Sequence, residues 1–125
     1  MRTPILKQGH YLIATLQKAL TDADLEQLRE ELAAEVRRHR SSGVVLDVAL
    51  LDVVDSFAAR TLRNMAHVVK LLGAETVVVG IQPDVAFSMV RLGLTLAGVE
   101  TALDLEEGLA ALQRLEHGED DDAAA

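Results

Sequence analysis

An apolar run that leads into a helical stripe, within residues 43–72, constrains the fold of this chain more than any other feature. The run GVVLDVALL, residues 43–51, has the apolar continuity of a strand buried on both faces, as parallel strands are in α/β folds. Beyond it, apolar residues recur at spacings of three and four, as on the buried stripe of a helix: Ala58, Leu62, Met65, Val69 and Leu72. The pattern predicts a buried strand that enters a helix through a tight acidic turn.

The start of this helix is predicted at Asp55 and Ser56. Asp is a favoured N-cap residue, because its carboxylate accepts a hydrogen bond from a free N–H group of the first turn. With Asp55 as the cap, Ser56 becomes the first helical residue. Its hydroxyl then lies at a helix end that is too polar to enter the core.

Strand and helix patterns alternate along the rest of the chain. The first two strand patterns are separated by a Gly turn typical of an antiparallel pair, and Pro in the first turn and an Asp-x-x-Glu capping box mark later helix starts. We expect strands at 4–7 and 11–16, a helix from Thr21 or Asp22 that 41–43 stop, a strand at 75–79, a helix opened by Gln82-Pro83-Asp84 that buries Val85, Met89 and Leu92, a strand at 100–102, and a helix capped by Asp104 and Glu107 that buries Leu105, Leu109, Leu112 and Leu115.

These patterns predict one α/β domain over residues 1–116. Its mixed β-sheet would begin with an antiparallel strand pair and carry about four packed helices. Residues 117–125, HGEDDDAAA, have nothing to bury and are expected to form an acidic disordered tail. In such sheets functional groups gather at the carboxyl ends of the strands, here residues 52–56 and 80–84.

Composition excludes several classes of partner. The chain has 20 acidic and 12 basic residues and a formal net charge of -8, which disfavours nucleic acid and anionic membranes as partners. Apolar runs are too short for a membrane span, and the first residues lack the apolar core of a signal peptide. The chain contains no Cys, which excludes disulfides and thiolate catalysis. We expect a cytoplasmic protein.

The sequence offers little for catalysis or for a cofactor. Among the histidines, His39 lies at a charged helix end, His117 in the tail, and His67 about 16 Å along the helix from Ser56, so none of these is placed to activate its hydroxyl. No Gly-x-Ser-x-Gly elbow and no phosphate-binding glycine loop is present. We expect a protein that is not an enzyme and that has no cofactor.

Three carboxylates, Asp47, Asp52 and Asp55, fall within one short segment. A Mg²⁺ site of the phospho-acceptor kind would draw carboxylates from two strand ends and a Lys from a third, whereas these come from one segment. The preferred interpretation is structural: Asp55 caps the helix, Asp52 faces solvent, and Asp47 is a polar strand position. No metal site is predicted.

Ser56 has two interpretations. It is either an ordinary residue of a helix start or an exposed phosphorylation target. A phosphate there would be repelled by Asp52 and Asp55 and stabilised by the helix N-terminus and Arg60, one turn on. The fold should therefore survive phosphorylation, and partner binding should change.

A family resemblance favours the second interpretation. The segments VVDSFA at 53–58, KLLGAETVVVGIQPDVA at 70–86 and TALDLEEGL at 101–109 resemble the STAS-domain anti-sigma-factor antagonists, and most of all the stressosome scaffolds of the RsbS type. The resemblance spans about residues 4–115 in one register. Phe57 and Ala58 replace the Ser and Gly that tend to follow the phosphosite in single-domain antagonists, and so favour the scaffold type.

The resemblance implies a partner-switching module. An RsbT-type serine/threonine kinase would be held by the unphosphorylated scaffold, would phosphorylate Ser56 and would then leave, and a phosphatase would reset the scaffold. RsbR-type STAS paralogues, which carry a sensory domain for which this chain has no room, would co-assemble with a homo-oligomer of it, a dimer within a larger assembly. The partner-binding residues expected from this role are Asp52, Asp55, Phe57, Arg60, Gln82 and Asp84.

Alternatives remain open at this stage. The chain could be a free antagonist that binds an anti-sigma kinase and liberates a sigma factor, in which case it should purify as a monomer or dimer. It could also be a STAS module that binds a small ligand at the strand ends, although acidic groups dominate there and suit an anionic ligand poorly. Thr21 or Thr61 could be phosphorylated in place of Ser56.

Overall fold

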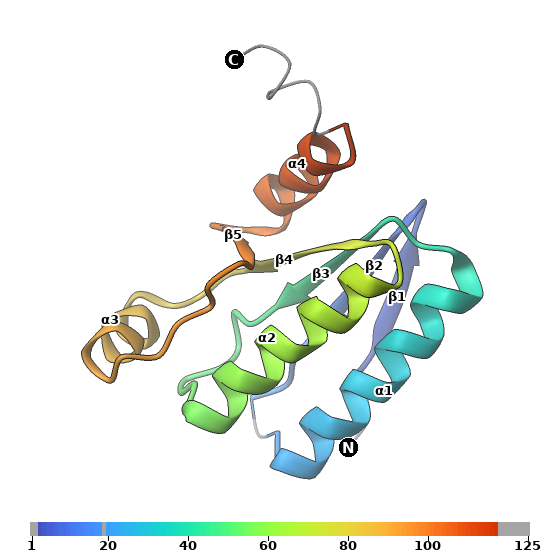
Figure 1. Cartoon of the computed structure of the whole chain (residues 1–125). Helices are drawn as coiled ribbons and strands as arrows, with labels where there is room; N and C mark the ends of the chain where they lie inside the picture. The colour runs from blue at the N-terminus through green and yellow to red at the C-terminus, as the bar shows by residue number, and fades with distance from the viewer. Residues whose placement is uncertain (1–2, 19, 118–125) are drawn as a thin grey trace.

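The structure, a computed structural model, describes residues 3–18 and 20–117. The acidic segment predicted to be disordered lies outside the described residues from position 118 onward. Strands and helices alternate as the sequence predicts (Figure 1). The elements are β1 (Ile5–Gln8), β2 (Tyr11–Thr15), α1 (Asp22–His39), β3 (Gly43–Asp47), α2 (Ser56–Leu71), β4 (Glu75–Val79), α3 (Pro83–Arg91), β5 (Glu100–Ala102) and α4 (Leu105–Glu116).

The strands form one mixed sheet in the order β1-β2-β3-β4-β5. β1 is antiparallel to β2, with Ile5 opposite Ala14, and the other neighbouring pairs are parallel. The predicted α/β fold with an antiparallel N-terminal pair is therefore confirmed. Because β2, β3 and β4 run in parallel, their carboxyl ends meet at one edge of the sheet, and that edge carries the connection to Ser56.

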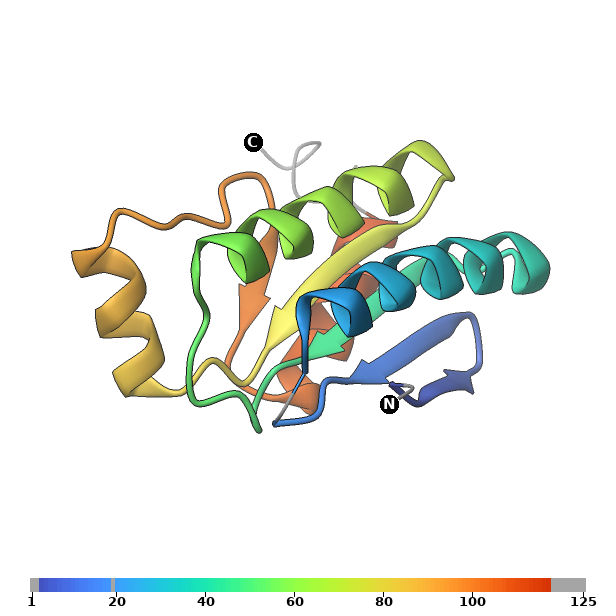
Figure 2. The same cartoon turned by 90° about the horizontal axis from the view of Figure 1, so that it is seen from below.

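Helices cover both faces of the sheet. α1 and α2 lie side by side on one face and α4 lies on the other (Figures 1 and 2). The side chains of β3 alternate accordingly: Val44 and Leu46 join the core beneath α1 and α2, whereas Val45 joins Leu112 of α4. This two-sided burial explains the unbroken apolar run of β3.

The first helix begins as predicted but ends differently. Thr21 is its N-cap: the Thr21 hydroxyl accepts from the Asp24 N–H at 3.1 Å and the Asp24 carboxylate accepts from the Thr21 N–H at 3.0 Å. The prediction that residues 41–43 stop this helix is corrected, because the left-handed residue at its end is Arg40, with φ 50°. Gly43 instead opens β3, where a Cβ would lie 3.0 Å from side-chain atoms of Leu112 and Tyr11.

The central strand is shorter than its apolar sequence predicts. β3 ends at Asp47, whose carboxylate accepts a hydrogen bond of 3.0 Å from the Ala49 N–H and so turns the chain. The Leu51 N–H then donates to the Val48 carbonyl at 3.0 Å. Residues 48–55 therefore form a long connection to α2, not the tight turn expected. Its apolar residues do not belong to a strand but pack under the connection or stay exposed.

Three leucines that were predicted to be buried are exposed. Leu72 caps the end of α2 and is 38% exposed, Leu92 follows α3 and is 67% exposed, and Leu105 opens α4 and is 36% exposed. Each lies at a helix terminus, where the stripe leaves the core. α4 packs on the sheet through the smaller residues Gly108 and Ala111, together with Leu112.

The predicted capping box of α4 forms only in part. The Asp104 carboxylate accepts from the Glu107 N–H at 2.9 Å, as expected. The Glu107 carboxylate accepts from the Leu103 N–H at 3.3 Å, and not from the N–H of Asp104 as the motif predicts. The cap thus extends one residue back toward β5.

Candidate functional site

Ser56 lies in the open at the first position of α2. Asp55 is the N-cap, with an extended backbone, and its Oδ1 accepts a hydrogen bond of 2.8 Å from the Ala58 N–H. The predicted cap is therefore confirmed. The Ser56 side chain is exposed, and its hydroxyl takes part in no hydrogen bond among the described residues. A large partner therefore has access to an oxygen that the fold does not use.

The two alternative hydroxyls lie in different settings. Thr61 is buried, with 5% of its surface exposed, and its hydroxyl donates to the Phe57 carbonyl at 2.8 Å. Thr21 is exposed, but its hydroxyl accepts from the Asp24 N–H and holds the start of α1. Of these three hydroxyls, only that of Ser56 is both exposed and without a structural hydrogen bond among the described residues.

The connection before Ser56 is anchored by apolar side chains. Val48, Leu51 and Val54 are buried in the core beneath α1 and α2. Between them, Leu50 and Val53 face solvent, with 48% and 72% of their surfaces exposed. The buried side chains thus hold the connection against the core, and its exposed side chains form an apolar surface beside Ser56.

The end of the neighbouring strand reaches the same place. The Gln82 side chain donates a hydrogen bond of 2.7 Å to the Ala49 carbonyl. Gly80 passes so close that a Cβ on it would lie 3.0 Å from the Ala49 Cβ. The structure therefore joins the second predicted strand end, residues 80–84, to the connection before Ser56 through Ala49.

The residues around Ser56, from the end of β3 to the start of α2, are called the corner below. A pocket of about 450 Å³ opens beside the corner, between the N-terminal ends of α1 and α2. Its floor is apolar and includes Leu16, Leu25 and Leu62, while the carboxylates of Asp52 and Asp55 line its rim. The rim also carries Lys18 and Asp22, which the sequence did not suggest. The pocket therefore offers an apolar seat within a mainly acidic border.

The basic groups near the corner have distinct roles. Asp52 is exposed, as predicted, and also pairs with Lys18, whose Nζ lies 3.1 Å from Asp52 Oδ2. Arg63 donates to the Thr95 carbonyl at 2.7 Å and holds the segment after α3. Arg60 is exposed and has no ion pair or hydrogen bond within residues 3–18 and 20–117. The sequence alone did not indicate Lys18, because its place beside Asp52 depends on β2 and β3 being neighbours in the sheet.

The other residues expected to bind a partner are spread around Ser56. Phe57 is half-buried against the core of α1 and α2. Gln82 is half-buried and tied to Ala49, as described above. Asp84 is exposed on the first turn of α3. The structure thus groups Asp52 and Asp55 at one pocket, whereas Asp84 lies on a separate helix.

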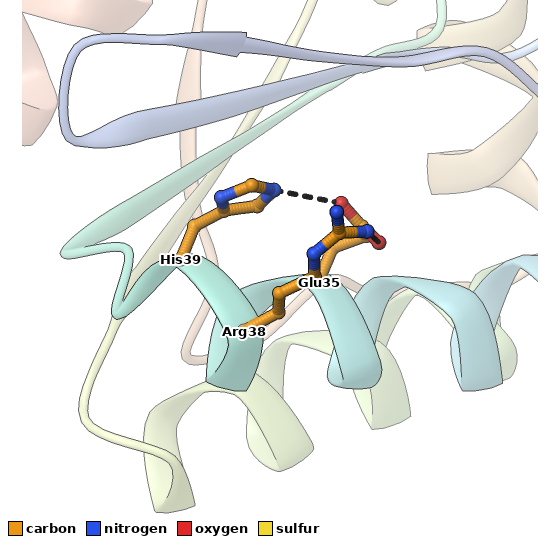
Figure 3. Close-up of polar contacts among 3 residues, drawn as sticks. All are labelled: Glu35, Arg38 and His39. Carbon is orange, nitrogen blue, oxygen red and sulfur yellow. Dashed lines mark hydrogen bonds and ion pairs between the residues drawn. The ribbon is translucent and has the colours of Figure 1, made fainter.

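The described histidines do not approach Ser56 along α2 or from α1. His39, at the far end of α1, lies with Nε2 3.0 Å from Glu35 Oε1, and Arg38 extends toward the other oxygen of the same carboxylate at 3.6 Å (Figure 3). His67 is exposed three turns along α2. His39 is therefore part of a charged helix end, as predicted.

Two carboxylates of the central segment accept hydrogen bonds from backbone N–H groups. Asp47 accepts from the Ala49 N–H and Asp55 accepts from the Ala58 N–H. Across the described part of the chain, no three His, Cys, Asp or Glu side chains are grouped as metal ligands would be. In the same residues, no helix is long and apolar enough to cross a membrane.

Comparisons with known proteins agree with this geometry. A family model described as the STAS domain matches residues 3–107. Among solved structures, the chain is similar to RsbS of Moorella thermoacetica carrying a Ser-to-Glu substitution, at 36% identity over 92% of this chain and 97% of that one, with a TM-score of 0.78. It is also similar to a chain from the molecular architecture of the stressosome, a signal integration and transduction hub, at 38% identity over 90% of this chain and 97% of that one, with a TM-score of 0.76.

A curated relative points to the same group of proteins. RsbRA of Bacillus subtilis (strain 168), named as an RsbT co-antagonist protein, is 33% identical over 84 residues. The match covers 67% of this chain and 31% of RsbRA. This chain therefore spans about a third of the length of the first curated relatives that it matches.

Proposed function

The chain belongs to the STAS-domain family, and from that premise we propose that it is a non-enzymatic phospho-switch scaffold of the RsbS type. In this proposal the unphosphorylated protein holds an RsbT-type serine/threonine kinase and releases it once Ser56 is phosphorylated. The resemblance to RsbS and to a stressosome chain over nearly the whole length supports the scaffold role. The name of RsbRA, a co-antagonist of RsbT, supports the class of kinase.

One observation carries the proposal: the exposed hydroxyl of Ser56, which has no structural hydrogen bond among the described residues. A kinase must bring an acceptor hydroxyl in line with a γ-phosphate, and this requires a side chain that can leave its resting position at little cost. The fixed connection beneath Ser56 and the Asp55 cap would hold the backbone still during that transfer.

Electrostatics explain how one phosphate could change partner binding without unfolding the protein. A phosphoserine carries a charge of about -1.5 to -2 at neutral pH. At position 56 it would lie at the N-terminus of α2, which stabilises anions, and one turn from Arg60, which has no ion pair among the described residues. It would also add to the charges of Asp52 and Asp55 at the pocket rim. The fold keeps its hydrogen bonds, while the surface that a kinase faces becomes more negative.

The kinase-facing surface would be the corner around Ser56. Asp52, Asp55, Phe57, Arg60 and Gln82 lie on the segments that meet there, with Asp84 at its border on α3. Between the acidic rim residues, the apolar floor of the pocket offers a seat for an apolar side chain of the partner. A phosphate on Ser56 would add bulk and negative charge at the edge of this surface, which would then no longer fit a kinase that binds the unphosphorylated form.

Other partners follow from the same role. RsbR-type STAS paralogues would co-assemble with this chain, as the similarity to RsbRA and to the stressosome chain supports. The chain itself would form a homo-oligomer within that assembly. A phosphatase would remove the phosphate from Ser56 and restore kinase binding.

The proposal is tested with Ser56→Ala and a cognate RsbT-type kinase. We expect the variant to keep the urea midpoint of the wild type and to lose phosphate transfer. Ser42→Ala is the matched control, because Ser42 lies at the opposite end of β3 and its hydroxyl donates only a long bond of 3.4 Å to the His10 carbonyl. Full labelling of Ser56→Ala would overturn the assignment, and Thr21→Ala would then show whether the phosphate resides at the exposed hydroxyl of Thr21.

A second variant tests release. Ser56→Asp adds one negative charge at the same position, and we expect less kinase to be retained in a pull-down than on the wild type. Ser56→Asn has a similar size without the charge and should retain the kinase. Equal retention on the Asp and Asn variants would contradict a mechanism based on charge.

A further inference from the structure

Helix α3 is attached to the body of the protein by one narrow side. Of its nine residues, only Val85 and Met89 are buried. In both views α3 lies beyond the ends of β4 and β5, apart from the other helices (Figures 1 and 2). Most of its surface is therefore open to a partner.

The open side of α3 is apolar at its centre. Phe87 and Val90 are 71% and 80% exposed, and Leu92, directly after the helix, is 67% exposed. At 100° per residue, Phe87 points directly away from the side that carries Val85 and Met89. Asp84 and Arg91 flank Phe87 on the same outer face, three residues before it and four after it.

The outer side of α3 carries an aromatic residue, a type that is rare in this chain. The sequence contains only two Phe and one Tyr, and one of these three aromatic residues stands exposed at the centre of the face. Aromatic residues surrounded by smaller apolar groups are typical anchors of protein interfaces. The face defined by Asp84, Phe87, Val90 and Arg91 is therefore a candidate contact surface, called the α3 face below.

We propose that the α3 face binds the same face of a second copy of this chain, with the two helices antiparallel. An antiparallel pairing about Phe87 places Asp84 of each copy opposite Arg91 of the other, so both charges find partners. A parallel pairing would instead oppose like charges. The two helix dipoles also run antiparallel, which is favourable.

The charge of the whole chain supports this choice of occupant. Two copies with a net charge of -8 repel each other, so self-association needs a contact that is locally neutral. The α3 face carries one acidic and one basic residue, whereas the corner at Ser56 is mainly acidic. The α3 face is self-complementary and isologous, as a two-fold dimer requires. The inference rests on the proposed scaffold function, for which it supplies the contact between copies.

The test uses charge reversal and the full chain alone. So small a contact is expected to give a dimer with a Kd on the order of 10–100 µM, which sedimentation equilibrium measures across that range. Asp84→Arg and Arg91→Asp should each raise the Kd about tenfold or more, because each creates two like-charge pairs per dimer. A one-to-one mixture of these variants should regain the wild-type Kd, since every pair is then again of opposite sign.

A second pair of variants tests the apolar centre. Phe87→Ser should raise the Kd at least about tenfold without changing the far-ultraviolet circular dichroism, since Phe87 is not part of the core. Leu71→Ser is the control, because Leu71 is 87% exposed at the end of α2, outside the α3 face, and its loss should leave the Kd unchanged.

Three results would overturn the inference: a wild type that stays monomeric up to about 1 mM, a mixture that does not recover, or equal effects of Phe87→Ser and Leu71→Ser. Phosphate transfer to Ser56 is measured on Arg91→Asp and Phe87→Ser, because neither residue is assigned to the kinase-facing surface. Transfer that persists in these variants when self-association fails separates this inference from the phospho-switch.

Discussion

The Gln82 side chain donates a hydrogen bond of 2.7 Å to the Ala49 carbonyl and so ties the start of α3 to the connection that precedes Ser56. These residues lie far apart in the sequence, at the ends of neighbouring parallel strands. This bond holds the beginning of the connection in place, and the Asp55 cap holds its end.

Removing this bond should loosen the corner. Gln82→Ala is expected to lower the free energy of unfolding by about 1 kcal/mol, the net value of one partly exposed hydrogen bond. Amide hydrogen exchange should rise in residues 49–54 and stay unchanged in α4. Gln113→Ala is a matched control, because Gln113 is exposed on α4. Exchange that rises equally throughout the protein would show that the bond has no local role.

Loss of the cap before Ser56 should cost more than loss of the neighbouring surface charge. Asp55→Ala removes the acceptor of the Ala58 N–H and should destabilise the protein by about 1 kcal/mol in urea unfolding, whereas Asp55→Asn keeps an acceptor and should cost less. Asp52→Ala breaks only an exposed ion pair with Lys18 and should change stability by less than about 0.5 kcal/mol. An equal cost for Asp52→Ala and Asp55→Ala would contradict the cap.

The contact of α4 with the sheet depends on the missing side chain of Gly108. A Cβ there would lie 2.5 Å from Val79 Cγ1. Gly108→Ala should therefore destabilise the protein by about 1–3 kcal/mol, although in an open helix the same change would gain about 1 kcal/mol. Val79→Ala removes the clashing methyl group, so the double variant should be more stable than the sum of the two single effects predicts. Strict additivity of the urea results would refute this close contact.

Tyr11 should titrate late and weaken the fold at high pH. Its hydroxyl donates to Glu116 Oε1 at 2.8 Å, and burial together with this bond raises the pKa of Tyr11 from 10.0 to about 12. The resulting stability is complete below pH 10, where the phenol is neutral in both states, and is lost as the pH rises toward 12. The chain has one Tyr and no Trp, so tyrosinate absorbance reports this group directly. Glu116→Gln should lower the midpoint, whereas Glu107→Gln, outside the pocket that Tyr11 and Glu116 line, should not.

Periodicity and local signals were enough to predict most of the framework. The antiparallel pair, the strand at 75–79, the helix opened by Pro83 and the Asp55 cap all appear as expected. Each depends on interactions within a few residues of sequence: a Gly turn, a carboxylate on a nearby N–H, a proline in a first turn. Such local signals can be recognised in the sequence without knowledge of the tertiary structure.

The connection at 48–55 could not be predicted, because an apolar residue pattern does not distinguish a strand from a loop that packs its side chains inward. Asp47 ends β3 by accepting from Ala49, and Val48 and Leu51 are then buried under the loop. The ion pair of Lys18 with Asp52 depends on strand order, which the sequence does not state. The exposure of Leu92 depends on the position of α3 relative to the sheet, which the spacing of apolar residues in α3 does not indicate.

The central claim, that phosphate on Ser56 releases a bound kinase, is tested most directly by measuring retained kinase against phosphate at that residue. Immobilised protein is incubated with an RsbT-type kinase and nucleotide, and the phosphate at Ser56 and the kinase that remains are quantified in each sample. The account predicts that retention falls in proportion as the Ser56 phosphate rises. Kinase that stays bound when Ser56 is fully phosphorylated, or that leaves while Ser56 is unmodified, would contradict it.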